Sequence, residues 1–350
     1  MNPHFQKLMS QATRLTGSGR LQAATAAIQS ALAAAGLTRA APTPAFKDVI
    51  DVQARELPSD ARQGVEAPVA EGFIAGSHAG AGLRRDYKLY IPPAAGEQPL
   101  PLVVMLHGCT QDPDDFAAGT AMNEAARAQG FYVLYPAQCR RANPQGCWNW
   151  FKHSHQQRGR GEPELLAGMT RAVMAEHAID PSRVYVAGLS AGGAMAAVLG
   201  LAYPELYAAI GVHSGLAAGA ATDLPSALAA MKNGSAAEPD SAHGRPTIVF
   251  HGDADGTVHP ANADRIVAAC AGATARAESQ HVQGEGGRAS TRRIYTDTQG
   301  QAIAEHWLVH GAPHAWSGGS PHGSYTDSRG PDATAEMLRF FLARPRRPLQ

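Results

Sequence analysis

The chain has 350 residues, which is enough for one large α/β domain with an extension. Its 30 Lys and Arg residues balance 30 Asp and Glu residues, so no excess charge draws it to nucleic acid or to a membrane surface. No stretch approaches the roughly 18 consecutive apolar residues that a membrane-spanning helix requires. The sequence pattern therefore gives no support to a nucleic-acid-binding or a membrane-spanning protein.

Residues 1–36 predict a helical hairpin, because apolar residues recur at helical spacing on both sides of a break at residues 17–19. A single helix pair cannot build a repeat array. We expect this hairpin either to pack on the body of the protein or to dock a partner. Residues 37–69 contain four prolines and read as a linker.

The N-terminal residues lack the basic segment and the uninterrupted apolar stretch of a secretory signal peptide, which predicts a cytoplasmic location. The cysteines are Cys109, Cys139, Cys147 and Cys270, and none belongs to a Cys-x-x-Cys pattern, so we predict no metal site. In the cytosol the thiols would stay reduced. In an exported protein, Cys139 and Cys147 could pair, because they flank a loop with Pro and Gly.

Residues 70–345 predict one catalytic domain of the α/β class. Antiparallel strands come first and repeated βα units follow, which indicates a mostly parallel sheet with helices on both faces. We expect strands at 72–74, 85–91, 102–106, 131–135, 184–187, 208–212, 246–250, 292–297 and 304–309. We expect helices at 118–128, 162–177, 193–201, 261–270 and 332–342, and a loop across 271–290.

The strand at 184–187 runs directly into Gly188-Leu189-Ser190-Ala191-Gly192 and then into a helix of small residues. Gly-x-Ser-x-Gly between a strand and a helix is the pattern of a nucleophile elbow. The turn leaves no room for side chains two residues from the serine, so both flanking residues are glycine. The helix N-terminus behind Ser190 favours developing negative charge. Because the bare motif is common, a turn without chemistry fits this stretch equally well by itself.

A serine nucleophile needs a base, and in α/β-hydrolases the acid and the histidine follow the serine on later strands. The strand at 246–250 ends at His251-Gly252-Asp253-Ala254-Asp255. Residues 251–258 resemble the His-Gly-x-x-Asp-x-x-Val turn that commonly carries the acid in this fold. The resemblance favours Asp255 as the acid, with Asp253 capping the turn. Asp297 is a weaker candidate, because it follows a peripheral strand.

The loop after the strand at 304–309 supplies the expected base, His314. His310 ends that strand and is expected to pack or to form the turn. His213 lies on another strand and is expected to be a core or rim residue.

An oxyanion hole needs two backbone N–H groups. We expect one from Ala191, the residue after the nucleophile, and one from Cys109 in the loop after the strand at 102–106, with Thr110 as the alternative donor. Cys109 as a nucleophile is the rival interpretation. It is disfavoured because no His and Asn arrangement surrounds it, whereas the serine elbow is complete.

Aromatic residues gather in the loop Cys147-Trp148-Asn149-Trp150-Phe151, and Trp316 follows the expected base by two residues. In a chain with only 6% aromatic residues, this concentration suggests that Trp148, Trp150 and Trp316 bind an apolar substrate. An aromatic plug that anchors the loop to the core is an equally good interpretation.

Five stretches together resemble the polyhydroxybutyrate depolymerase family of esterases, whose relatives include feruloyl and acetylxylan esterases. They occur in the family's order over about residues 70–345. They are Leu106-His-Gly-Cys-Thr-Gln111, Cys147-Trp-Asn-Trp-Phe151, Gly188-Leu-Ser-Ala-Gly-Gly-Ala-Met195, His251-Gly-Asp-Ala-Asp255 and His314-Ala-Trp-Ser-Gly-Gly319. The resemblance implies an α/β-hydrolase fold, and ester hydrolysis without a metal or other cofactor. It also supports Ser190, Asp255 and His314 as the triad and Cys109 as an oxyanion donor.

The resemblance implies a polyester of 3-hydroxybutyrate type, or its oligomers, as the substrate. A feruloyl or acetyl ester is the alternative within the same chemistry. Residues 1–36 would then contact a polymer granule or a protein. A binding or scaffolding module that kept the hydrolase fold is the alternative from another class.

Overall fold

The computed structural model of the chain describes residues 72–235, 245–272, 275–283 and 287–346. The predicted hairpin at 1–36 and the linker at 37–69 lie outside these residues. In the part of the chain that is described, no helix is both long enough and apolar enough to cross a membrane.

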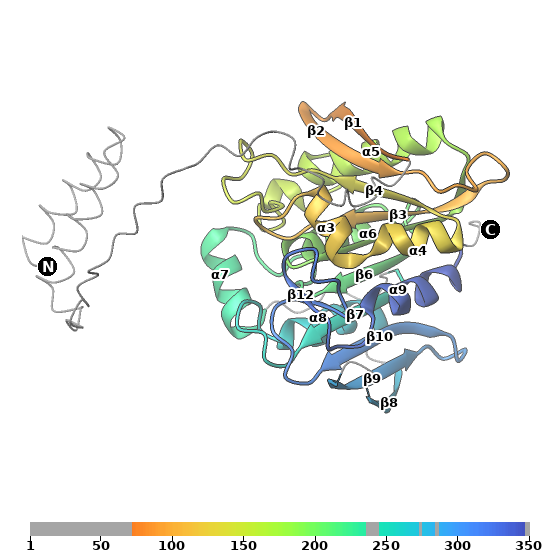
Figure 1. The fold of residues 1–350 in the computed structure, drawn as a ribbon. Coiled ribbons are helices and arrows are strands. Elements are labelled where there is room, and N and C mark those ends of the chain that lie inside the picture. The colour runs from red at the N-terminus through yellow and green to blue at the C-terminus, as the bar shows by residue number, and fades with distance from the viewer. Residues whose placement is uncertain (1–71, 236–244, 273–274, 284–286, 347–350) are drawn as a thin grey trace, which may run out of the picture. The chain divides into compact units, whose positions relative to one another are not determined.

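A ten-stranded sheet with the order β1-β2-β4-β3-β5-β6-β7-β10-β9-β8 forms the centre of the domain (Figure 1). Neighbours from β4 to β10 in this order are parallel, and antiparallel pairs extend the sheet at both ends. The strands are β1 (Phe73–Gly80), β2 (Leu83–Tyr90), β3 (Leu100–Leu106), β4 (Tyr132–Pro136), β5 (Ile179–Leu189), β6 (Ala209–His213), β7 (Thr247–Gly252), β8 (Arg276–Gln283), β9 (Ala289–Thr296) and β10 (Ala302–Val309). The predicted α/β class with a mostly parallel sheet is confirmed.

Helices cover both faces of this sheet, and a second, two-stranded sheet pairs β11 (Trp316–Ser317) with β12 (Thr326–Asp327) (Figure 1). The helices are α3 (Pro113–Thr120), α4 (Met122–Gln129), α5 (Gly161–Glu176), α6 (Ala191–Ala202), α7 (Leu224–Asn233), α8 (Ala261–Ala271) and α9 (Ala333–Leu342), with a 3₁₀ turn η2 at His153–His155.

The alternation of side chains along β3 shows how the sheet separates two cores. Leu102 and Val104 pack in the cluster that includes residues of α5, α6 and α8, whereas Val103 and Met105 pack in the cluster with residues of α3, α4 and α9. Every residue of β3 is buried, because successive side chains point to opposite faces and both faces are covered. This burial explains the continuous apolar run in the sequence.

The predicted helix at 118–128 is wrong in its extent, because α3 begins earlier and Ala121 separates it from α4. The Asp112 carboxylate caps α3 by accepting the N–H of Asp115, and Pro113 follows it. Ala121 has a left-handed φ of 51°, which interrupts the helical path.

The loop predicted across 271–290 is also wrong, because it contains β8. The residues of this strand are almost all exposed and polar, so they lack the apolar alternation by which a strand is recognised. Hydrogen bonding to β9 at the edge of the sheet creates the strand. The sequence analysis also missed α7, although a capping box at Asp223 and Ser226 marks its start.

Candidate active site

Ser190, Asp255 and His314 follow β5, β7 and β10, respectively. The strands β5, β6, β7 and β10 are parallel neighbours. Their carboxyl ends therefore meet at one edge of the sheet, which is where open α/β sheets place their sites. Asp297 lies in the turn before β10 and accepts the backbone N–H groups of Gln299 and Gln301. The turn is at the amino end of that strand, so Asp297 is excluded as a partner of His314.

Ser190 stands at a sharp turn between β5 and α6. Its φ is 57°, a left-handed value that costs about 1–3 kcal/mol for a non-glycine residue and is common at active sites. Its N–H donates to the carbonyl of His213 on β6 at 2.8 Å. The conformation matches the elbow predicted from the sequence.

Close backbone contact explains the two glycines of this elbow. A Cβ added at Gly192 would lie 1.9 Å from the carbonyl oxygen of Leu106, and one at Gly188 would lie 2.4 Å from the carbonyl carbon of Gly192. No real Cβ tolerates such distances. The expectation that the turn excludes side chains at both positions is confirmed. The obstacle at Gly192 is the end of β3, and the obstacle at Gly188 is the carbonyl group of Gly192 followed by the same strand end.

The carboxylate of Asp255 is fully buried and held from several sides. Its Oδ1 accepts the N–H groups of Thr257 and Val258 at 2.9 Å each, and its Oδ2 accepts Nδ1–H of His314 at 2.7 Å. Burial raises the pKa of Asp255, but hydrogen bonds from His251, His314 and Val258 together bring it well below its usual range. Asp255 is therefore a carboxylate at neutral pH, and its hydrogen bond to Nδ1 orients the His314 ring.

A second Asp–His pair lies nearby but is open to solvent. His310 Nδ1 lies 2.8 Å from Asp253 Oδ2, and each side chain is 39% exposed. The N–H of Gly311 donates to Asp253 Oδ1 at 2.6 Å, and the other ring nitrogen of His310 lies 2.9 Å from Thr291 Oγ1. Asp253 thus holds the loop that leads to His314 through its hydrogen bonds to His310 and Gly311, as a turn-capping residue does.

His213 joins the serine side of the site to the histidine side, a role that the sequence analysis did not assign. Its Nε2 accepts the N–H of Ser317 at 2.9 Å, and its ring stacks with Phe250 and Trp316 at centroid distances of 5.7 and 5.1 Å. Burial, together with the nearby rings of His251 and His314, lowers the pKa of His213 to about 3. The ring is therefore neutral. The sequence signal for this role was a histidine at the end of a buried strand.

The loop after β3 presents the expected oxyanion donor. Among the described residues, neither the N–H of Cys109 nor that of Ala191 donates a hydrogen bond to another group. Gly108 N–H donates to Gln111 Oε1 at 2.9 Å, and Thr110 N–H donates to the carbonyl of Gln145 at 2.7 Å. Thr110 is thereby occupied, which leaves Cys109 as the better candidate of the two.

The structure pairs Cys109 with Cys147 in a disulfide, whereas Cys139 and Cys270 are free. The pairing of Cys139 with Cys147 that the sequence allowed is wrong, because residues 38 positions apart meet when the loop folds back over the end of β3. A sulfur in a disulfide is not a thiolate. The interpretation of Cys109 as a nucleophile is therefore excluded for this state of the protein.

The three tryptophans expected to bind substrate lie in the core. Trp148 is completely buried and donates its indole N–H to the carbonyl of His107 at 3.1 Å. Trp316 is 1% exposed and donates to Thr334 Oγ1 at 3.0 Å, and Trp150 is 5% exposed. Their burial agrees with the alternative interpretation, an aromatic plug, and lends no support to direct substrate contact.

A buried carboxylate holds the aromatic loop in place. Glu162 accepts the backbone and side-chain N–H groups of Asn149 at 2.7 and 2.8 Å, and the side chain of Gln138 at 2.6 Å. Arg85 lies 3.3 Å away. Burial raises the pKa of Glu162, but hydrogen bonds from His155, Gln138 and Asn149 bring it below its usual value. The loop is therefore held by its hydrogen bonds to the Glu162 carboxylate as well as by its buried tryptophans.

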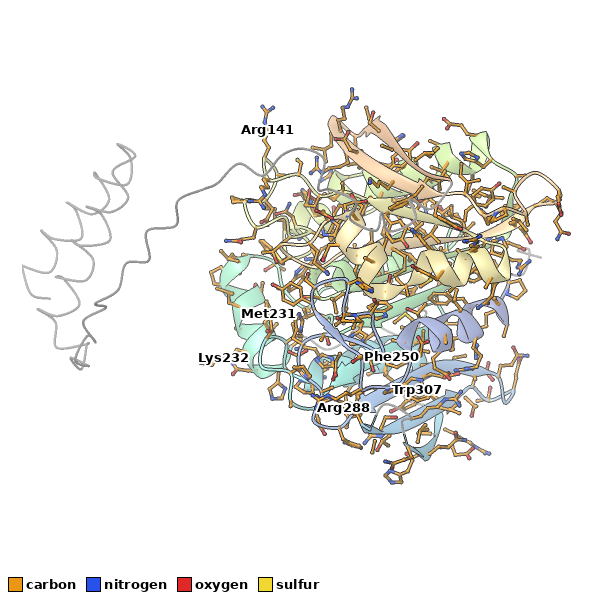
Figure 2. All side chains as sticks on the ribbon, in the orientation of Figure 1. Arg141, Met231, Lys232, Phe250, Arg288 and Trp307 are labelled. Carbon is orange, nitrogen blue, oxygen red and sulfur yellow. A yellow bond between two sulfur atoms is a disulfide. The ribbon has the colours of Figure 1, made fainter. Side chains whose placement is uncertain are left out.

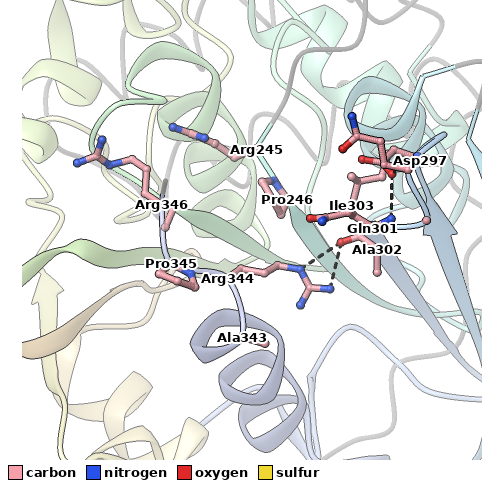
Figure 3. Close-up of a pocket in the computed structure, with 13 residues that line it drawn as sticks. Arg245, Pro246, Asp297, Gln301, Ala302, Ile303, Ala343, Arg344, Pro345 and Arg346 are labelled. Carbon is pink, nitrogen blue, oxygen red and sulfur yellow. Dashed lines mark hydrogen bonds between the residues drawn. The ribbon is translucent and has the colours of Figure 1, made fainter. Parts of the chain in front are cut away.

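A cavity of about 850 Å³ lies at the opposite edge of the sheet, at the amino ends of β6, β7 and β10 (Figure 3). Arg245, Arg344 and Arg346 contribute to its lining. Arg344 donates to the carbonyl of Ala302, as the close-up shows. This cavity is separate from the edge that carries Ser190.

A strand-to-helix serine turn and a buried Asp–His pair at the carboxyl edge of the sheet define the α/β-hydrolase class. Solved structures agree on the fold. An acetyl xylan esterase from Aspergillus awamori aligns with a TM-score of 0.57 at 20% identity, over 73% of this chain and 93% of that one. An esterase from Thermogutta terrifontis aligns with a TM-score of 0.51 at 14% identity, over 78% and 95%.

The sequence comparisons give the family. Residues 85–277 match the family described as esterase PHB depolymerase, and the chain belongs to it. A poly(3-hydroxyalkanoate) depolymerase C of Paucimonas lemoignei is 39% identical over 48% of this chain and 43% of its own length. A poly(3-hydroxybutyrate) depolymerase of Ralstonia pickettii is 32% identical over 63% and 48%. A feruloyl esterase B of Neurospora crassa is 28% identical over 59% and 76%. The chain spans less than half the length of the two depolymerases.

We expect Gly192→Ala to lower the free energy of unfolding by about 1–3 kcal/mol or more, because the new methyl group would overlap the carbonyl of Leu106. Gly256→Ala is the matched control, since a Cβ at Gly256 meets nothing within 4 Å. Urea unfolding of both variants measures the difference. Equal stability of the two would show that the elbow does not need its close contact with β3.

We expect two titratable thiols in the denatured, unreduced protein, because Cys109 and Cys147 are joined. Replacing both by serine should lower the free energy of unfolding by about 2–4 kcal/mol, since the disulfide limits the unfolded chain. Cys139→Ser is the control and should change it by less than about 1 kcal/mol. Thiol titration that finds four reactive groups would contradict the pairing.

Proposed function

We propose that the protein is a serine carboxylesterase in which Ser190, His314 and Asp255 form the catalytic triad. The observation that carries the proposal is the 2.7 Å hydrogen bond between His314 and the buried carboxylate of Asp255. This pair lies at the same sheet edge as the strained Ser190 turn. His213 supports their proximity, because its carbonyl accepts the N–H of Ser190 while its ring accepts the N–H of Ser317, three residues after His314.

In the proposed reaction, Ser190 Oγ attacks the ester carbonyl carbon while Nε2 of His314 takes the hydroxyl proton. The N–H groups of Cys109 and Ala191 stabilise the oxyanion of the tetrahedral intermediate. His314 then gives its proton to the leaving alcohol as the C–O bond breaks, and the acyl group stays on Ser190. Water, deprotonated by His314, releases the acid. Asp255 stabilises the imidazolium in both steps.

We propose a 3-hydroxyalkanoate polyester or its oligomers as the substrate. The names of the two depolymerase relatives support this choice. A feruloyl or acetylxylan ester is the second candidate, which the feruloyl esterase relative supports. A scaffolding module without activity is disfavoured, because the elbow retains a strained serine that packing alone does not require.

Two further features are predicted from the sequence alone. One is a contact between residues 1–36 and a granule or a protein. The other is the cytoplasmic location. Disulfides persist mainly in oxidising compartments, so the thiol titration described above also bears on the location.

We expect Ser190→Ala to lower kcat on p-nitrophenyl butyrate by at least about a thousandfold, and Asp255→Ala to lower it by about 10³–10⁴. Asp253→Ala should lower kcat by less than about tenfold, because its pair with His310 is exposed and holds a loop. Steady-state kinetics on the three variants separates the two acids. Activity that survives Asp255→Ala but is lost in Asp253→Ala would reverse the assignment.

Three substrates distinguish the ester classes: amorphous polyhydroxybutyrate, methyl ferulate and an acetylated sugar. We expect release of 3-hydroxybutyrate units from the first and at most slow turnover of the others, with Ser190→Ala as the blank. Product analysis by chromatography gives the rates. Faster release of ferulate or acetate would move the assignment to the second candidate.

A further inference from the structure

Tyr325 is an exposed aromatic residue in the loop between β11 and β12. Its side chain is 45% exposed, and the other large apolar residues with comparable exposure in the described chain are aliphatic, namely Ile74, Leu201, Leu224 and Leu228. Its φ is 52°, in the left-handed region that non-glycine residues rarely adopt. The fold thus holds a partly exposed aromatic ring on a strained backbone, and backbone strain of this kind clusters at functional sites.

The backbone of Tyr325 is fixed beside the loop of the proposed base. Its carbonyl accepts the N–H of Trp316, two residues after His314, at 2.7 Å. The next residues form β12, which pairs with β11. Arg288, labelled in Figure 2, bonds to both Asp327 of β12 and the carbonyl of Gly311. Tyr325 therefore keeps a set position relative to His314.

The hydroxyl of Tyr325 reaches the opposite side of the site. It lies 3.0 Å from Oγ1 of Thr110, the residue after Cys109. Thr110 Oγ1 donates its proton to the carbonyl of Cys109 at 2.6 Å, so the tyrosine hydroxyl is the donor in the contact between them. The side chain spans the distance from the base loop to the oxyanion loop.

The residue before Tyr325 is tied to the same oxyanion loop. Gln111 donates to the carbonyl of Ser324 at 3.2 Å and to Asp115 Oδ2 at 2.8 Å. Ser324 N–H donates to Asp115 Oδ1 at 2.7 Å. Gln111 also accepts the N–H of Gly108. The ring is thus positioned in advance by the loop that carries Cys109, which reduces the ordering needed on binding.

We propose that Tyr325 is a substrate-binding residue whose ring supports the polyester chain beyond the scissile ester. The proposal rests on the proposed function, in which the ester carbonyl lies between His314 and the N–H of Cys109. Tyr325 connects the loops that carry these two residues. The methyl and methylene groups of a 3-hydroxyalkanoate chain are apolar and would pack on an aromatic face. The buried Trp148, Trp150 and Trp316 offer no such exposed face.

The test compares the linear trimer of 3-hydroxybutyrate with methyl 3-hydroxybutyrate, which has one ester and no further chain. For Tyr325→Ala we expect KM for the trimer to rise about tenfold while kcat changes less than about threefold. On the methyl ester, kcat/KM should change less than about threefold. Tyr325→Phe keeps the ring, so its KM for the trimer should stay within about threefold of wild type.

Two further variants keep the test decisive. Tyr325→Gly removes the ring at a φ that glycine adopts freely, and it should reproduce the rise in KM even if Tyr325→Ala folds poorly. Ile74→Ala is the matched control, because Ile74 is 46% exposed and lies on β1, at the edge of the sheet. It should leave both substrates unchanged.

An unchanged KM for the trimer in Tyr325→Gly would overturn the proposal. So would equal losses on both substrates, or losses in kcat that Tyr325→Phe shares, since these indicate a structural role. Wild-type protein that hydrolyses the methyl ester but not the trimer would overturn the polyester contact alone. Wild-type protein no more active than Ser190→Ala on either substrate would instead overturn the proposed function.

Discussion

The arrangement of the site depends on one close contact, that between the backbone of Gly192 and the carbonyl of Leu106 at the end of β3. This contact lets the first turn of α6 lie directly against the strand end. The loop that follows Leu106 carries Cys109. The close approach of α6 to the end of β3 therefore brings the serine and the proposed oxyanion donor together. A side chain at position 192 would separate them.

The opposite side of the site is fixed by residues that do no chemistry in the proposed mechanism. His213 holds Ser317, and Asp253 holds Gly311, so the loop with His314 is bound on both sides of the histidine. The two Asp–His pairs lie in different environments. The Asp255 pair is buried, where a charge interaction is strong, whereas the Asp253 pair is solvated and weak. The two pairs contain the same chemical groups, and the difference in burial makes their interactions differ in strength.

The third side of the site is the aromatic loop at residues 147–151. The disulfide, Glu162 and the tryptophans attach this loop to the rest of the domain. Cys147 is bonded to Cys109, and Asn149, two residues later, is bonded to Glu162. Trp148, between these two residues in the sequence, is completely buried and donates its indole N–H to the carbonyl of His107. On the other side, Gln111 donates to Asp115 and to the carbonyl of Ser324, so both flanking loops are attached to the short segment after β3. That segment is consequently rigid, as preorganised oxyanion donors require.

The sequence by itself determined the α/β class, the parallel strands and the elbow, and it predicted the Asp255 and His314 that the structure joins by a hydrogen bond, because each is encoded by neighbouring residues. An apolar run predicts a buried strand, and Gly-x-Ser-x-Gly after it predicts the turn. Only the tertiary structure decided the partner of Cys147, the burial of the tryptophans and the existence of β8. Contacts between distant segments create these features, as with Tyr325 and Thr110, which are 215 positions apart. Local periodicity carries no signal for such pairs, since the residues meet only after the sheet has formed.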